Sequence, residues 1–328
     1  MTLDKLENKE NISINYTRLS FLQTKEWSLI NNLFNKSREI IISDDSKEIV
    51  GKFFIKDTTV FYKKIIKNIL RIESGVMECH CGPVFSKDCS DVKINNFLDS
   101  LIFTVKKIKI SNVLITTNSF DNGNLIYRFV KLSEKKGFKF FEQYNPIVDL
   151  RESENDILMS FKNSARTGAR KAISKGVSVK VCKTFDEYMK VINLSSSVKN
   201  LEKKRLKDHR FFWDNNSSKY SYFYSELNGE IFSALGTYEN EGVVTPISSC
   251  ISKSGLESKI PVQDLLFREI IIYHKKKGND FFELTPVIFD DNLMTKKEIG
   301  IRSFKLKWSR KFLKQYRLEM NVDDIKKI

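Results

Sequence analysis

The chain has 328 residues, 41% of them apolar, which is enough to build the cores of two domains of ordinary size. It has no apolar run of the roughly 18–20 residues that span a bilayer, and its charged start (residues 1–11) lacks a signal-peptide core. These features predict a cytoplasmic protein. The net charge of +15 predicts attraction to nucleic acid, phosphorylated small molecules or an anionic membrane surface. A solvated, lysine-rich surface is the alternative.

The first half alternates predicted helices and strands, which is typical of an α/β architecture. Periodic apolar residues predict helices over 21–34, 92–107 and 123–136, with Gly137 ending the last of them. Strands are predicted over 38–43, 48–56, 59–71, 112–117 and 138–150.

The second half continues in the same way. Helices are predicted over 184–199, 206–216 and 262–277, and strands over 219–226, 230–238, 242–252 and 280–285. Asn228-Gly229 indicates a hairpin turn between two of these strands. Pro261 suits the first turn of the long helix, and Gly278 suits its end.

Two pairs of segments indicate an internal duplication. The stretch SDDSKEIVGKFF resembles YSELNGEIFSAL, and LSEKKGFKFFE resembles IYHKKKGNDFFE. The simplest interpretation is an α/β protein with mixed sheets and two similar domains, residues 1–150 and 151–328, which meet near Arg151.

Basic residues are concentrated in two segments. Residues 161–175 hold five basic side chains and no acid. On a helix Lys162, Arg166 and Arg170 share one face, and Lys171 and Lys175 form an adjacent row. Like charges at this spacing repel, so the row favours phosphate binding, with a solvated face as the alternative.

Residues 302–317 hold seven basic side chains and no acid. On a strand Phe304 and Trp308 would face one side, and Lys305 and Lys307 the other. An edge strand protected by lysines and a groove for a nucleotide or RNA backbone both explain this pattern.

Other chemical signals are weak. His274 lies beside Lys275–Lys277 and is predicted to be a surface residue rather than a catalytic one. Cys79-His80-Cys81 lacks the four converging ligands that zinc needs, so we expect a core or edge strand and no metal site. The five cysteines show no disulfide framework, which fits a reducing compartment.

Several segments together resemble a known family, in the same order and over roughly residues 20–310. They are FLQTKEW (21–27), GPVF (82–85), NSARTGARKAISKGVSVKV (163–181), KIPVQDLLFREIIIYHKKKGNDFFEL (259–284) and IGIRSFKLKWS (299–309). The chain is similar to the Fem-type aminoacyltransferases of peptidoglycan bridge formation. That resemblance implies two tandem acetyltransferase-like (GNAT-like) domains.

The resemblance also implies a reaction and a site. It implies transfer of an amino acid from aminoacyl-tRNA to an amine of a nucleotide- or lipid-linked cell-wall precursor, with no cofactor and with contact at the inner membrane face. Lys305, in the Phe-Lys motif, would be the catalytic cation, and Phe304 would bind substrate. Arg166, Arg170 and Lys171 match basic positions that face the phosphate-linked acceptor. Glu283, after the penultimate strand, is expected to orient the amine.

Departures from the family pattern leave the donor and the acceptor open. Trp308-Ser309 replaces Phe-Gly, and Glu283-Leu284-Thr285-Pro286 replaces Asp-Leu-Gly-Gly. One alternative is an acyl-CoA-dependent N-acyltransferase acting on an amino sugar or a nucleotide-linked precursor. The segment SKSGLESKIPV before the long helix lacks the glycine-rich pyrophosphate turn of such enzymes. A second alternative is a non-catalytic protein that binds RNA or another polyanion.

Overall fold

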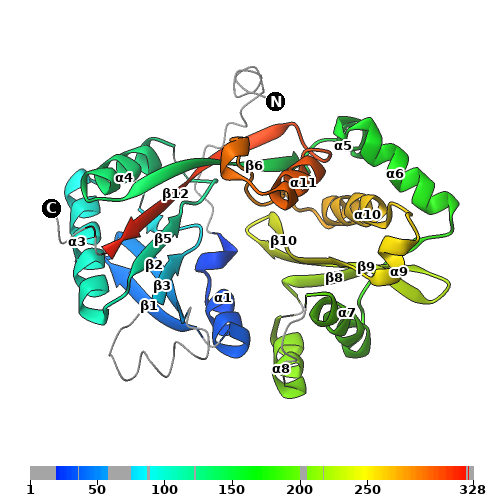
Figure 1. The fold of residues 1–328 in the computed structure, drawn as a ribbon, viewed down its shortest axis with the longest axis horizontal. Helices are drawn as coiled ribbons and strands as arrows, with labels where there is room; N and C mark the ends of the chain where they lie inside the picture. The colour runs from blue at the N-terminus through cyan, green and yellow to red at the C-terminus, as the bar shows by residue number, and fades with distance from the viewer. Residues whose placement is uncertain are drawn as a thin grey trace. The chain divides into compact units, whose positions relative to one another are not determined.

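A computed structural model describes residues 20–35, 37–57, 75–86, 89–121, 123–199, 205–216, 218–322 and 324. The described chain forms two compact units (Figure 1). Of the described residues, the N-terminal unit comprises those from 20 to Gln143 together with the last segment, from Lys314 onward. The C-terminal unit comprises Tyr144–Leu313. The last strand thus leaves the C-terminal half of the sequence and completes the N-terminal unit.

The N-terminal unit is built on a mixed sheet with the strand order β1-β2-β3-β5-β12, and β4 pairs with β2. β1 and β2 are antiparallel, β3 and β5 are parallel, and β12 is antiparallel to β5. The elements are η2 (Phe21–Gln23), α1 (Lys25–Ile30), η3 (Asn31–Asn35), β1 (Arg38–Ser43), β2 (Ile49–Asp57), β3 (Gly75–Cys79), β4 (Val84–Phe85), α3 (Asp91–Ile108), β5 (Asn112–Thr116), α4 (Gly123–Lys135) and β12 (Lys311–Asn321). The strand β6 (Lys139–Asp149) begins in this unit and continues into the C-terminal unit.

Helix α3 supplies much of the core of this unit. Its buried residues Ile94, Leu98, Leu101 and Val105 recur every three or four positions, so they form one stripe. Ser90 begins the helix by accepting a hydrogen bond from the backbone amide of Lys93. α3 packs against α4, and the two helices share a single hydrophobic core with β2, β3 and β5.

The C-terminal unit has the strand order β6-β11-β10-β9-β8-β7. β7 to β10 are antiparallel neighbours, whereas β10 and β11 run parallel. Its elements are α5 (Glu154–Ser160), α6 (Asn163–Ser174), β7 (Ser178–Val181), α7 (Phe185–Val198), α8 (Leu206–Asn216), β8 (Tyr220–Leu227), β9 (Glu230–Asn240), β10 (Val243–Ile251), α9 (Lys253–Glu257), α10 (Val262–Lys276), β11 (Phe281–Glu283), η4 (Asp291–Leu293) and α11 (Lys296–Lys305).

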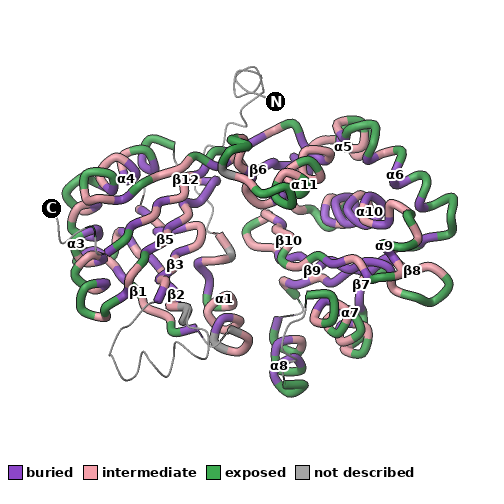
Figure 2. Tube along the Cα trace, viewed as in Figure 1, coloured by how far each residue is buried: buried purple, intermediate pink, exposed green. Residues whose placement is uncertain are grey.

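Helices cover both faces of this second sheet. On β8, Tyr222 contacts Tyr188 of α7, and its neighbour Phe223 contacts Tyr273 of α10. Because successive strand residues point to opposite faces, α7 and α10 lie on opposite sides of the sheet. α10 is buried along most of its length (Figure 2), in keeping with the apolar residues Leu265–Phe267 and Ile270–Ile272 in its middle.

An ion pair between a buried aspartate and a half-buried lysine joins α10 to the segment after α11. Lys307 Nζ lies 3.1 and 3.2 Å from the carboxylate oxygens of Asp264. Burial raises the pKa of Asp264, and Lys307 opposes that rise. Gly168 of α6 packs directly on this carboxylate, because an added Cβ would overlap it. Only glycine therefore allows α6 to approach α10 this closely.

We expect Lys307→Met to lower the free energy of unfolding by about 2 kcal/mol at neutral pH, because it leaves a buried carboxylate without its cation. The loss should shrink as the pH falls, since protonation removes the buried charge of Asp264. Urea unfolding at pH 5 and pH 7.5 measures both effects. The double variant Lys307→Met/Asp264→Asn should recover most of the loss, and no recovery would contradict this account.

Most of the predicted elements are confirmed, including the strand pair 38–43 and 48–56 and the helices 92–107, 206–216 and 262–277. The strand predicted over 59–71 lies outside the described residues. The strand arrangement of residues 304–308 is wrong, because Phe304 and Lys305 end helix α11 and the strand begins only at Lys311. Thr295 and Glu298 form a capping box that starts this helix.

The domain boundary after residue 150 stays a prediction. The two compact units of the structure divide between Gln143 and Tyr144. Among the described residues, no helix has the length and apolarity needed to cross a bilayer.

Candidate functional site

A cavity opens where two parallel strands of the C-terminal unit separate. β10 pairs with β11 only at Val243–Phe281 and Val244–Phe282, and β10 then continues to Ile251 while β11 ends at Glu283. The cavity has a volume of about 580 Å³. Such a volume is typical of small-molecule sites. Its walls come from β10, α10, α11 and the residues that follow β11.

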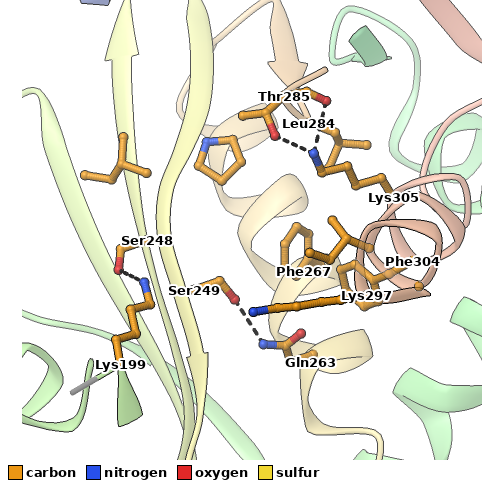
Figure 3. A pocket seen from close by; sticks show the side chains of 14 residues that line it. Lys199, Ser248, Ser249, Gln263, Phe267, Leu284, Thr285, Lys297, Phe304 and Lys305 are labelled. Atoms are coloured by element: carbon orange, nitrogen blue, oxygen red, sulfur yellow. Dashed lines mark hydrogen bonds between the residues drawn. The ribbon is translucent and has the colours of Figure 1, made fainter. Parts of the chain in front are cut away.

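Lys305, the last residue of α11, lies in this cavity. Its Nζ donates hydrogen bonds to Thr285 Oγ1 at 2.7 Å and to the Thr285 carbonyl at 3.4 Å (Figure 3). It also donates one to the Pro286 carbonyl at 3.1 Å. Burial lowers the pKa of Lys305 to about 8, and the carboxylate of Glu283 opposes this effect. The ammonium group is therefore held by oxygen dipoles rather than by a direct carboxylate contact.

Thr285, which accepts hydrogen bonds from Lys305, has an unusual backbone conformation. Its φ angle is +63°, in the left-handed region that β-branched residues rarely adopt. This conformation accompanies hydrogen bonds from Lys305 to both the carbonyl and the hydroxyl of Thr285. The Fem-type pattern has glycine in this stretch, so the side-chain contact is a feature of this chain.

Three aromatic rings form and support one wall of the cavity. Phe267 and Phe304 line it, with ring centroids 4.9 Å apart in an edge-to-face arrangement. Behind them, the fully buried Trp308 stacks on Phe267 at 5.7 Å and meets Phe304 at 6.0 Å. This packing fixes the orientation of Phe304, the neighbour of Lys305.

Polar side chains line the β10 side of the cavity. Lys199 Nζ donates a hydrogen bond to Ser248 Oγ at 3.0 Å, and Gln263 Nε2 donates one to Ser249 Oγ at 3.0 Å (Figure 3). Lys297 of α11 also lines the cavity. Sequence reasoning missed all of these residues. The one available signal was the Thr-Pro-Ile-Ser-Ser stretch of β10, which departs from the family pattern.

Glu283 lies near this site but does not line the cavity. It is buried, and it accepts hydrogen bonds from Asn145 Nδ2 at 2.6 Å and from Thr245 Oγ1 at 3.3 Å. The structure thus places Glu283 in a side-chain network next to Lys305, whose charge it favours. Direct contact of Glu283 with a substrate amine stays a prediction.

The basic residues of α6 do not line the cavity either. Arg166 donates hydrogen bonds to the Met159 and Phe161 carbonyls at 2.7 and 3.2 Å, and so caps the end of α5. Arg170 and Lys171 are exposed on the same helix. The structure therefore brings together Lys305 and Phe304 but leaves the α6 residues on a separate surface of the unit.

The prediction that His274 is a surface residue is wrong. His274 is 1% exposed, and its Nε2 lies 2.9 Å from Thr237 Oγ1. Burial lowers its pKa to about 3, so the ring is neutral. The basic run that follows it in the sequence belongs to the end of α10, whereas His274 itself points into the core.

The cysteine–histidine segment holds no cluster of ligands. Cys79 is buried at the end of β3, and His80 Nε2 lies 2.9 Å from Glu78 Oε2. Within the part of the chain that the structure describes, no group of three or more His, Cys, Asp or Glu side chains is arranged to hold a metal ion.

The arrangement of the elements is similar to that of several solved structures. FemX has a TM-score of 0.63 at 12% sequence identity, and the match covers 98% of this chain and 99% of that one. L-PGS from Bacillus licheniformis has a TM-score of 0.56 at 15% identity, covering 98% and 92%. The C-terminal domain of a putative lysylphosphatidylglycerol synthetase from Agrobacterium fabrum has 0.55 at 14%, covering 90% and 89%.

No family model and no curated protein sequence matches the chain. The structural likeness defines the fold as a Fem-like pair of acetyltransferase-like (GNAT-like) units. The resemblance noted in the sequence therefore holds at the level of the fold.

Proposed function

We propose that this protein is an enzyme that transfers an acyl group to an amine, and that the cavity beside Lys305 is its active site. The observation that carries this proposal is a half-buried lysine at the point where two parallel strands diverge, facing a cavity of about 580 Å³. The Fem-like fold supports the same class of reaction.

Acyl transfer to an amine requires the enzyme to align the two reactants and to stabilise the negative charge on the carbonyl oxygen. The amine attacks the carbonyl carbon of an ester or thioester, a C–N bond forms, and the negative charge develops on the carbonyl oxygen. The bond to the leaving oxygen or sulfur then breaks, and the amine loses a proton that the leaving group takes up. The protonated Lys305 would stabilise the oxyanion, and the walls of the cavity would align the two reactants.

We favour aminoacyl-tRNA as the donor and a phosphate-linked peptidoglycan-type precursor as the acceptor. The similarity of the fold to FemX and to the C-terminal domain of a putative lysylphosphatidylglycerol synthetase supports this choice. A lipid-linked acceptor would bring the protein to the inner face of the membrane. Arg170 and Lys171, exposed on α6, have the charge to contact its phosphates.

A donor assay tests the proposal. Purified protein is incubated with a nucleotide-linked muropeptide and either a radiolabelled aminoacyl-tRNA pool or radiolabelled acyl-CoA. We expect label to pass from tRNA to the acceptor. Transfer only from acyl-CoA would keep the reaction class and replace the donor. Binding of both polyanions without any transfer would favour the non-catalytic alternative.

A further inference from the structure

The charged side chains that line the cavity, among the described residues, are all cationic. Its fourteen described lining residues include Lys199, Lys297 and Lys305 but no aspartate or glutamate. The two nearby buried acids are engaged elsewhere, because Glu283 accepts from Asn145 and Thr245, and Asp264 pairs with Lys307. A cationic group inside this cavity would meet three like charges and would lack a lining carboxylate to replace its water shell.

The uncharged part of the lining is mostly apolar. The apolar lining side chains are those of Pro246, Ile247, Phe267, Leu284, Ile301 and Phe304. Phe267 and Phe304 are held edge-to-face against each other and supported by Trp308, so this surface is rigid. A rigid apolar surface binds an aliphatic or aromatic group by removing its surface from water.

We propose that the cavity selects an acyl group with an uncharged, apolar side chain and rejects one with a cationic side chain. This inference rests on the proposed acyl transfer, and it names the chemical class of the transferred group. Lys199 and Lys297 act as specificity-determining residues. Both are exposed, so their ammonium groups can also attract the phosphates of a tRNA or CoA carrier. The same charges thereby admit a polyanionic donor and exclude a cationic acyl group.

A matched pair of neutral and charged probes tests the selection without turnover. N-acetyl-norleucinamide and N-acetyl-lysinamide have the same four-carbon side chain and differ by the terminal ammonium group. We expect the full-length protein to bind the norleucine probe at least about tenfold more tightly, as measured by titration with ligand-observed NMR. Preference for the lysine probe, equal affinity, or binding of neither probe at millimolar concentration would overturn the inference.

Three variants locate the effect. Lys297→Glu should strengthen binding of the lysine probe about fivefold or more. The ratio between the affinities for the norleucine and lysine probes should therefore become smaller. Lys253→Glu, on an exposed lysine that does not line the cavity, should leave the preference unchanged. Ile301→Asp should weaken binding of the norleucine probe, because Ile301 lines the cavity. Ile301 is 45% exposed, so this change should not disturb the hydrophobic core. A preference that Lys297→Glu does not alter would count against the role of the lining charges.

Transfer assays separate this inference from the proposed function. If leucyl or phenylalanyl donors react and lysyl or arginyl donors react equally well, acyl transfer stands and the selection is wrong. If the probes show the expected preference while no donor reacts, the selectivity of the cavity stands and the proposed acyl transfer is wrong.

Discussion

Lys305→Met should lower kcat/KM for acyl transfer by a factor of about 100 or more, because it removes the half-buried cation that we place next to the reacting carbonyl. Methionine keeps much of the length of the lysine side chain and removes its charge. Steady-state rates with the preferred donor measure the loss. Lys297→Met, at an exposed lysine that also lines the cavity, should lower kcat/KM less than about tenfold in the same assay. Equal losses in the two variants would show that Lys305 has no special role.

The pH dependence gives a second measure of the same residue. Lys305 has a pKa of about 8, so its charge is lost as the pH rises through that value. We expect kcat/KM to fall above about pH 8. Lys305→Arg, which keeps its charge at every accessible pH, should retain part of the activity and lose that limb of the profile. A limb that persists unchanged in Lys305→Arg would assign it to another group.

The pH dependence of the free energy of unfolding should also depend on Lys305, independently of any substrate. The pKa of Lys305 is lower in the folded protein, about 8, than its ordinary value of 10.5, so the unfolded chain binds more protons between these values. Stability contributed by this group therefore rises as the pH increases from about 8 to 10.5. In Lys305→Met this rise should be absent. Urea unfolding at pH 7.5 and pH 9.5 compares the two proteins.

Trp308→Ala should lower the free energy of unfolding by about 3–5 kcal/mol, the cost of emptying a large aromatic site in a core. Trp308 is fully buried, and its ring contacts Phe161, Phe267 and Phe304. Urea unfolding followed by circular dichroism measures the loss. Trp213→Ala serves as the matched control, because Trp213 is only partly buried on α8 and should cost clearly less.

A conservative change at the same position isolates the packing contribution. The indole nitrogen of Trp308 has no hydrogen-bond partner among the described residues, so Trp308→Phe removes no hydrogen bond. We therefore expect Trp308→Phe to cost about 1–2 kcal/mol, well below the alanine variant. If the phenylalanine and alanine variants were equally unstable, a polar contact rather than packing would account for the effect.

The order of elements follows from local sequence. Period-3.6 apolar residues place α3 and α10, and Asn228-Gly229 places the hairpin between β8 and β9, because these signals act over a few neighbouring residues. The segment from Arg302 to Trp308 misled the prediction, since its alternation of apolar and basic residues fits a strand. The capping box at Thr295 and Glu298 starts a helix that continues to Lys305 instead.

The sequence by itself determined the α/β class, most element positions and Lys305 with Phe304 as candidates, because these depend on short-range patterns and on a motif. Only the tertiary structure decided that the last strand completes the N-terminal unit and that Lys199, Lys297 and Lys305 line one cavity. It also decided that His274 is buried. Side chains that lie far apart in the sequence meet only when β10 and β11 pair briefly and then diverge, and long-range strand pairing of this kind has no local signature in the chain.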